Sequence, residues 1–141
     1  MRFLPSIALV LVLGAVARAG EPVSAAATSY RIETEGSTRQ LPAGADGKLV
    51  IDIVPLKGTH VNAEAPLKIA LSGTPGLKLS RDTLGHRDAL DPGSDGARFV
   101  VPFTATRAGA QEARARVDFF ICSDEWCVKQ SREVTVAVEV R

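Results

Sequence analysis

The chain has 141 residues, 45% of them hydrophobic, and its formal net charge at pH 7 is +1. This length is enough for one domain with a buried core. The net charge is near zero and the charged residues are scattered along the chain, so we expect no binding to nucleic acid or anionic membranes. With two cysteines and two histidines, a closed four-ligand zinc site would need carboxylates as well. We therefore expect no metal and no cofactor.

Residues 1–19 have the three parts of a secretory signal peptide. Arg2 supplies the positive charge, residues 4–17 form the apolar run, and Ala17-Arg18-Ala19 is a small-x-small cleavage site. The apolar run is too short for a membrane span, and no second one follows, although a retained anchor helix is the alternative. We expect a periplasmic or secreted protein without a membrane span after signal removal, in a compartment where disulfides form.

The remainder of the chain predicts a short tether and one domain. Residues 20–29 are small and Ala-rich with little to bury, so we expect a flexible tether. Over residues 30–141, apolar and polar residues alternate in short stretches between Gly- and Pro-containing turns, which is typical of half-buried β-strands. The expected strands are 30–35, 48–56, 66–72, 77–79, 97–105, 111–122 and 127–140, and the two long loops are 36–47 and 85–96.

The predicted domain, 30–141, is all-β. No segment after the signal peptide has a clear helical period. Roughly seven to nine short antiparallel strands separated by turns are typical of an immunoglobulin-like β-sandwich, which is the fold we predict. A closed barrel is the structural alternative.

Cys122 and Cys127 are separated by four residues, between the last two predicted strands. Four residues is a common length for a hairpin loop. Facing Cα atoms of antiparallel strands lie about 4.5–5.5 Å apart, a distance that a disulfide accepts. The sequence therefore predicts one disulfide across this loop.

Alternation assigns each residue of this hairpin to a face. The residues expected to face the core are Val117, Phe119, Ile121, Val134, Val136, Val138 and Val140. Both cysteines fall on the opposite, outer face. Phe120 and Trp126 would add exposed aromatic surface beside the sulfurs, and we predict that they contact a partner. Gln130 and Arg132 fall on the inner face, where we expect a bulge or an edge.

The residues alone leave two functions open for the cysteine pair. A bridge over so short a loop stabilises a fold by on the order of 2 kcal/mol. In the first alternative, the bridge is a structural staple in a non-catalytic β-sandwich interaction module. A surface disulfide in a tight loop is also open to attack by a partner thiolate. In the second alternative, the cysteine pair carries out thiol–disulfide exchange, an oxidoreductase-type reaction that needs no cofactor of its own.

Several motifs occur in an order that resembles a known family. They are His60-Val61-Asn62, Ala65-Pro66-Leu67-Lys68-Ile69, Gly76-Leu77-Lys78-Leu79, Phe99-Val100-Val101-Pro102-Phe103 and the stretch from Val117 through Cys122 and Cys127 to the Val-rich end. Together, from about His60 onward, they resemble the N-terminal periplasmic domain of the thiol:disulfide interchange protein DsbD. The cysteine hairpin is the most specific part of the resemblance.

The resemblance implies an immunoglobulin-like fold and a redox-active pair, Cys122 and Cys127. It also implies protein partners in trans that are thioredoxin-like or disulfide-isomerase-like, with Cys127 forming the mixed disulfide first. The family has five residues between its cysteines and an aromatic-tipped cap loop that shields them. This chain has four, and the corresponding loop, 85–96, contains no aromatic residue. We therefore expect His86 or Leu90 to cover the sulfurs, with Trp126 as the alternative.

Overall fold

The computed structural model describes residues 21–141. The signal peptide predicted for residues 1–19 lies outside the described part. The helices are α1 (Glu21–Ala27) and the short 3-10 helix η1 (His86–Asp88). The strands are β1 (Tyr30–Glu33), β2 (Gln40–Leu41), β3 (Asp46–Pro55), β4 (His60–Val61), β5 (Lys68–Gly73), β6 (Leu77–Leu79), β7 (Thr83–Leu84), β8 (Ala97–Ala105), β9 (Gly109–Cys122) and β10 (Cys127–Val140).

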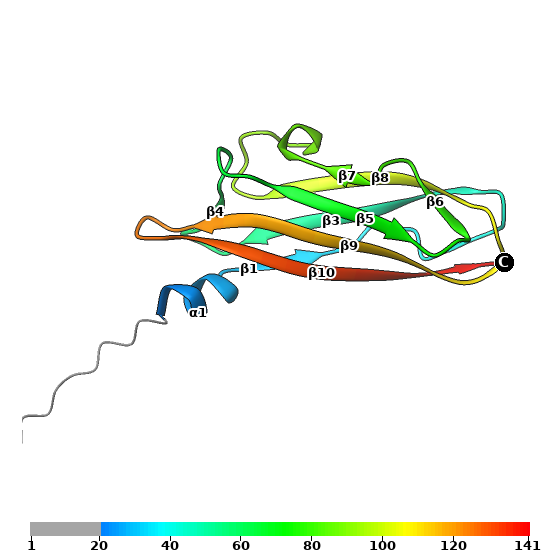
Figure 1. Cartoon of the computed structure of the whole chain (residues 1–141), viewed down its shortest axis with the longest axis horizontal. Helices are drawn as coiled ribbons and strands as arrows, with labels where there is room; N and C mark the ends of the chain where they lie inside the picture. The colour runs from blue at the N-terminus through cyan, green and yellow to red at the C-terminus, as the bar shows by residue number, and fades with distance from the viewer. Residues whose placement is uncertain (1–20) are drawn as a thin grey trace, which may run out of the picture.

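The strands form two sheets that pack face to face (Figure 1). One sheet has the order β1-β3-β8-β6, and the other has the order β2-β10-β9-β5-β7, with β4 also paired to β9. Pairing is antiparallel except between β2 and β10, which are parallel. The predicted all-β, immunoglobulin-like sandwich is confirmed, and two separate sheets replace the alternative of a closed barrel.

The described chain has ten strand segments rather than seven to nine, because three two-residue strands, β2, β4 and β7, carry no signal in the sequence. The long strands match the prediction closely, since β8 and β10 have the expected bounds and β9 begins two residues earlier than expected. Long strands carry several periods of alternation, whereas two residues carry none.

The core lies between the sheets and follows the predicted alternation. Val117, Phe119 and Ile121 of β9 are completely buried. On β10, three of the four predicted core valines are buried, and Val134 is partly buried against the core cluster. The sandwich is thus held together by one face of each long strand.

Residues 20–29 were expected to form a flexible tether, but Glu21–Ala27 is the helix α1. Ala26 is completely buried within the core cluster, and α1 lies against β10. The guanidinium of Arg132 donates to the carbonyl of Ala27 at 3.4 Å. Alanine has the highest helix propensity, and its small side chain allows close approach to a sheet. The Ala-rich composition that suggested a tether therefore supports a packed helix.

The bulge expected near the inner polar residues of β10 is absent between residues 109 and 140. Pairing with β9 continues without interruption from Cys127–Cys122 to Val140–Gly109. The alternative, an edge, is correct: β2 pairs with β10 only at its last two residues, 139 and 140. Before that point, within the described part of the chain, β10 has a neighbouring strand on one side only.

Tyr30 explains how two polar side chains fit on the inner register of β10. Its hydroxyl donates to Oε1 of the buried Gln130 at 2.9 Å. The guanidinium of Arg132 lies 5.4 Å from the centre of the Tyr30 ring, which is a cation–π distance. The Tyr30 ring also packs edge-on against Phe119, with 4.9 Å between ring centroids. Tyr30, at the start of β1, therefore contacts both polar side chains, so β10 accommodates them without a bulge.

Candidate functional site

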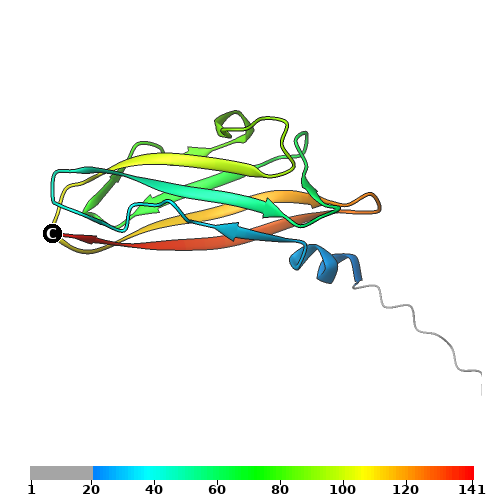
Figure 2. The ribbon, with the colours of Figure 1, turned by 180° about the vertical axis from the view of Figure 1, so that it is seen from behind.

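The predicted disulfide between Cys122 and Cys127 is present and joins the ends of β9 and β10. Their Cα atoms are 4.1 Å apart. The loop between them protrudes at the end of the sandwich opposite the C-terminus, as both overall views show (Figures 1 and 2). The bridge therefore lies at an extremity of the molecule, where another protein can approach it.

Ser123 organises the four-residue loop. Its backbone N–H donates to the carbonyl of Trp126 at 2.8 Å. Its Oγ accepts from the backbone N–H groups of Glu125 at 3.1 Å and Trp126 at 3.3 Å. A serine that accepts from backbone two and three residues ahead is a common turn motif. The loop geometry is therefore fixed by the residue after Cys122 as well as by the bridge.

The two bridged cysteines differ in exposure. Cys122 is 1% exposed, whereas Cys127 is exposed. The cause is their position in the sheet: Cys122 pairs with Cys127 on one side and with His60 of β4 on the other. Among residues 21–141, Cys127 has no such neighbour on its outer side, because β10 is an edge strand there. The outer-face assignment from the sequence was correct, but it did not reveal that Cys122 is covered.

Asn62, directly after β4, contacts both sulfurs. Its Nδ2 lies 3.5 Å from Sγ of Cys122 and 3.9 Å from Sγ of Cys127. Its Oδ1 accepts from the backbone N–H groups of Glu64 at 2.8 Å and Ala65 at 2.9 Å. Only the amide oxygen can accept these two bonds, so the NH₂ group must face the sulfurs.

Sequence reasoning quoted Asn62 within a motif but did not assign it to the site. The signal available was local: asparagine is a common turn residue because its side chain accepts from backbone two residues ahead. What the sequence could not show is that this turn lies over the sulfurs. That placement comes from the bond between the N–H of Asn62 and the carbonyl of Phe120, at 2.9 Å.

His86 and Leu90, the predicted cap residues, occupy different positions relative to the bridge. Nε2 of His86 lies 2.6 Å from the carbonyl oxygen of Ala65. A carbonyl only accepts, so Nε2 carries the proton of this bond. Through Ala65, His86 is linked to Asn62 and so to the sulfurs. Leu90 is 55% exposed, and its backbone N–H donates to the carbonyl of Arg98. Coverage of the sulfurs by either side chain stays a prediction.

Asp88 holds the turn that carries His86. Its Oδ2 accepts from the N–H of Gly85 at 2.8 Å, and its Oδ1 accepts from the guanidinium of Arg81 at 3.3 Å. The bond from Gly85 is the main cause that lowers the pKa of Asp88, and burial opposes it more weakly. The carboxylate is therefore ionised at neutral pH, in the form that accepts both bonds.

Phe120 and Trp126 are each partly exposed, so they form less free aromatic surface than the sequence suggested. Trp126 also packs partly against the core cluster. Both remain open to contact on their exposed portions, and their role as partner contacts stays a prediction.

Asp118 lies on the same outer face of β9 as Cys122, four residues before it. A hydrogen bond from the Ser131 side chain is the main cause that lowers its pKa; burial opposes this with a smaller effect, and the charges of Arg116 and Lys129 lower the pKa further. The side chain is therefore a carboxylate at neutral pH. The outer face beside the cysteines is charged, which suits an exposed protein surface.

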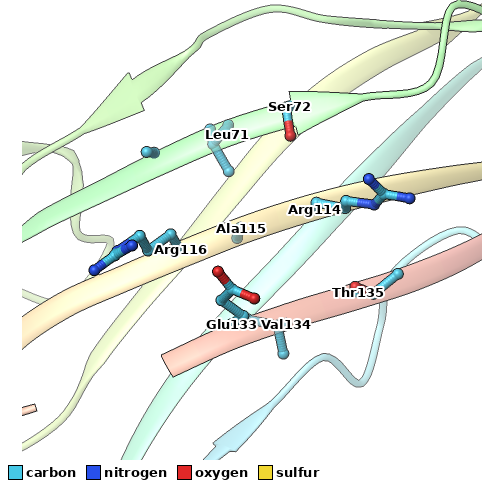
Figure 3. Close-up of a pocket in the computed structure, with 9 residues that line it drawn as sticks. Leu71, Ser72, Arg114, Ala115, Arg116, Glu133, Val134 and Thr135 are labelled. Atoms are coloured by element: carbon cyan, nitrogen blue, oxygen red, sulfur yellow. The ribbon is translucent and has the colours of Figure 1, made fainter. Parts of the chain in front are cut away.

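Farther from the bridge, a hollow lies on the outer face of β5, β9 and β10 (Figure 3). Figure 3 shows the carboxylate of Glu133 between the side chains of Arg114 and Arg116, which extend in opposite directions. Each arginine already has an ion partner two residues away on β9: Glu112 for Arg114 and Asp118 for Arg116. These solvated pairs indicate an ordinary charged sheet surface.

Within residues 21–141, no three side chains of His, Cys, Asp or Glu gather in a way that could hold a metal ion. The same part of the chain contains no helix with the length and apolar character that crossing a membrane requires.

No family model and no curated protein matches this chain. Among solved structures, it is similar to the native form of Escherichia coli alpha-2-macroglobulin, with 21% identity and a TM-score of 0.51. The match covers 80% of this chain but only 7% of that one. The chain is also similar to a conjugative transposon lipoprotein from Bacteroides eggerthii, with 12% identity, a TM-score of 0.43 and coverage of 79% and 97%. At such identities the first likeness supports the sandwich fold alone.

Proposed function

We propose that this protein exchanges disulfides and thiols with protein partners through Cys122 and Cys127, as the resemblance to the N-terminal domain of DsbD implies. The observation that carries the proposal is the unequal exposure of two bridged cysteines at a protruding loop. Among residues 21–141, Cys127 is exposed on the edge strand β10, whereas Cys122 is 1% exposed. A partner thiolate therefore approaches Cys127 more readily than Cys122.

The exchange proceeds in two displacements. A partner thiolate attacks Sγ of Cys127, a partner–Cys127 disulfide forms, and the bond to Cys122 breaks, with its electron pair left on Sγ of Cys122. A second thiolate of the partner then attacks the partner's own sulfur in this mixed disulfide and releases Cys127 as a thiolate. The partner's dithiol has become a disulfide, and this chain has gained two electrons and, as a dithiol, two protons. The reverse sequence reduces the partner.

The presence of a disulfide supports an exported protein, because disulfides form and persist in oxidising compartments. We propose a periplasmic or secreted location on this ground. Partners with a thioredoxin-like or disulfide-isomerase-like dithiol fit the exchange, and the partly exposed faces of Phe120 and Trp126 supply apolar contact beside the sulfurs.

The reduction potential of the Cys122–Cys127 couple tests the proposal. The protein is equilibrated in buffers of defined thiol–disulfide ratio, the thiols are alkylated, and the reduced fraction is read by mass. We expect a value between about −180 and −270 mV, the range of thiol-exchange proteins. A value below about −300 mV is typical of structural bridges and would overturn the proposal in favour of a stapled interaction module.

Single-cysteine variants test which sulfur receives the partner. Cys122→Ala leaves the exposed Cys127 as a free thiol, and we expect it to trap a thioredoxin-like protein as a stable mixed disulfide. Cys127→Ala is the matched control, since it leaves only the covered thiol of Cys122 and should trap far less. Equal trapping by the two variants, or more by Cys127→Ala, would contradict the proposed order of attack.

A further inference from the structure

We infer that Asn62 is a further catalytic residue of this site: its side-chain amide donates a hydrogen bond to Sγ of Cys122 and stabilises the charge that this sulfur takes up when Cys127 is attacked. The inference rests on the proposed exchange. It assigns the leaving sulfur and names the group that assists its departure.

The distances fit this role. Nδ2 of Asn62 is nearer to Sγ of Cys122, at 3.5 Å, than to Sγ of Cys127, at 3.9 Å. Negative charge develops on the leaving sulfur during the displacement. A hydrogen-bond donor already aimed at that atom stabilises the transition state, because no rearrangement is needed when the charge appears.

The burial of Cys122 makes such a donor necessary. A sulfur in a residue that is 1% exposed receives little stabilisation from water when it becomes a thiolate. Burial without a donor would disfavour the charged form, whereas a hydrogen bond to that form favours it. The amide of Asn62 takes the place of the missing water at the covered sulfur.

The donor is held in place independently of the bridge. The backbone N–H of Asn62 donates to Phe120, and Oδ1 accepts from Glu64 and Ala65. Rotating the amide by half a turn would aim the oxygen at the sulfurs and break both of the bonds to Oδ1. These three bonds involve neither sulfur, so they still hold the NH₂ group at Cys122 after the bridge opens.

His86 supports this arrangement as a positioning residue. Its Nε2 donates to the carbonyl of Ala65, the residue whose N–H fixes Oδ1 of Asn62. Loop 85–96, predicted from the resemblance to cap the sulfurs, thus holds the turn that brings the donor to them.

The test compares Asn62 variants in the full chain. Asn62→Asp keeps an oxygen for the turn but removes the donor, and Asn62→Ala removes the donor without adding charge. We expect both to slow reduction of the bridge by dithiothreitol roughly tenfold or more, the value of a hydrogen bond to a charged group. When combined with Cys127→Ala, each Asn62 substitution should also raise the pH at which Cys122 ionises, as measured by thiolate absorbance.

Two controls separate catalysis from local structure. Ala63→Ser alters an exposed residue of the same turn that takes no part in these bonds, so its reduction rate should equal that of the unmodified protein. His86→Ala should slow reduction less than Asn62→Ala, and His86→Gln should restore the rate, because the amide of glutamine can donate to Ala65. Circular dichroism confirms that each variant is folded.

The outcomes distinguish this inference from the proposed function. If the couple lies in the exchange range but folded Asn62→Ala and Asn62→Asp are reduced at the unmodified rate, the role of Asn62 is overturned and exchange stands. If the couple lies below about −300 mV while the Asn62 variants still shift the ionisation of Cys122, exchange is overturned and the amide remains a donor to that sulfur.

Discussion

The two faces of the β9–β10 ribbon differ sharply near the cysteines, although their residues alternate along the same strands. On the inner face, Val117, Phe119 and Ile121 are completely buried. On the outer face, Asp118 and Phe120 are partly exposed to solvent. Because the side-chain period of a strand is two, stability and surface chemistry fall to adjacent residues. A single substitution on β9 or β10 can therefore alter either the stability or the surface chemistry and leave the other intact.

The outer face is itself divided by strand order. Cys122 is on a strand with neighbours on both sides, and Cys127 is on an edge. The sheet covers Cys122 and leaves Cys127 exposed. The direction of attack in the proposed exchange follows from this asymmetry.

The largest expected effect separates the two faces at neighbouring positions. Phe119→Ala removes a completely buried ring and should lower the free energy of unfolding by about 3–5 kcal/mol. Phe120→Ala, on the outer face, should lower it by less than about 1 kcal/mol but weaken trapping of a thioredoxin-like partner. Chemical denaturation gives both stabilities. Similar losses at the two positions would show that the faces are not separated as described.

A smaller effect is expected from removing the bridge. The double variant Cys122→Ala/Cys127→Ala should lose about 2 kcal/mol, because the closed loop is short and constrains the unfolded chain little. It should keep the β-sheet spectrum of the unmodified protein and lose all exchange. Failure of the double variant to fold would show that the outer face, too, determines stability.

The smallest effect concerns the inner polar contact. Tyr30→Phe leaves Oε1 of the buried Gln130 without its donor and should cost about 1–2 kcal/mol in unfolding free energy. Gln130→Leu is the matched partner variant. Adding Tyr30→Phe to it should cost less than Tyr30→Phe alone, since no buried oxygen is then left unpaired. Equal costs in the two backgrounds would contradict the importance of this bond.

The same variant changes the response to high pH. Burial is the main cause that raises the pKa of Tyr30, and Arg132 opposes it more weakly. The folded state therefore favours the neutral phenol, and this contribution to stability is complete below the ordinary tyrosine pKa of about 10 and is lost as pH rises through the higher folded value. Between about pH 9 and pH 11, the unmodified protein should lose more stability than Tyr30→Phe.

Most of the ribbon was predictable because its signals are local. Fourteen-residue β10 has the bounds that alternation indicated, and the facing of Cys122 and Cys127 followed from the length of the loop. Alternation also placed Phe119 on the inner face and Phe120 on the outer face. Each of these inferences uses residues within one hairpin, where the chain itself keeps the partners close.

The remaining parts of the site depend on contacts between distant residues. β4 has only two residues, and its pairing with the end of β9 joins His60 to Cys122. The same pairing brings Asn62 to the sulfurs. α1 was missed because burial of Ala26 against the sheet, and not a helical pattern of apolar residues, holds it in place. Short elements stabilised by tertiary packing leave little trace in local sequence.

The sandwich class, the long strands, the hairpin and its disulfide could be predicted from the sequence, because hydrophobic alternation and turn length act over a few neighbouring residues. The burial of Cys122, the exposure of Cys127 and the direction of the Asn62 amide toward the sulfurs become visible only in the folded chain. These features depend on which strand lies beside which, and strand order is set by the packing of the whole core rather than by any local pattern.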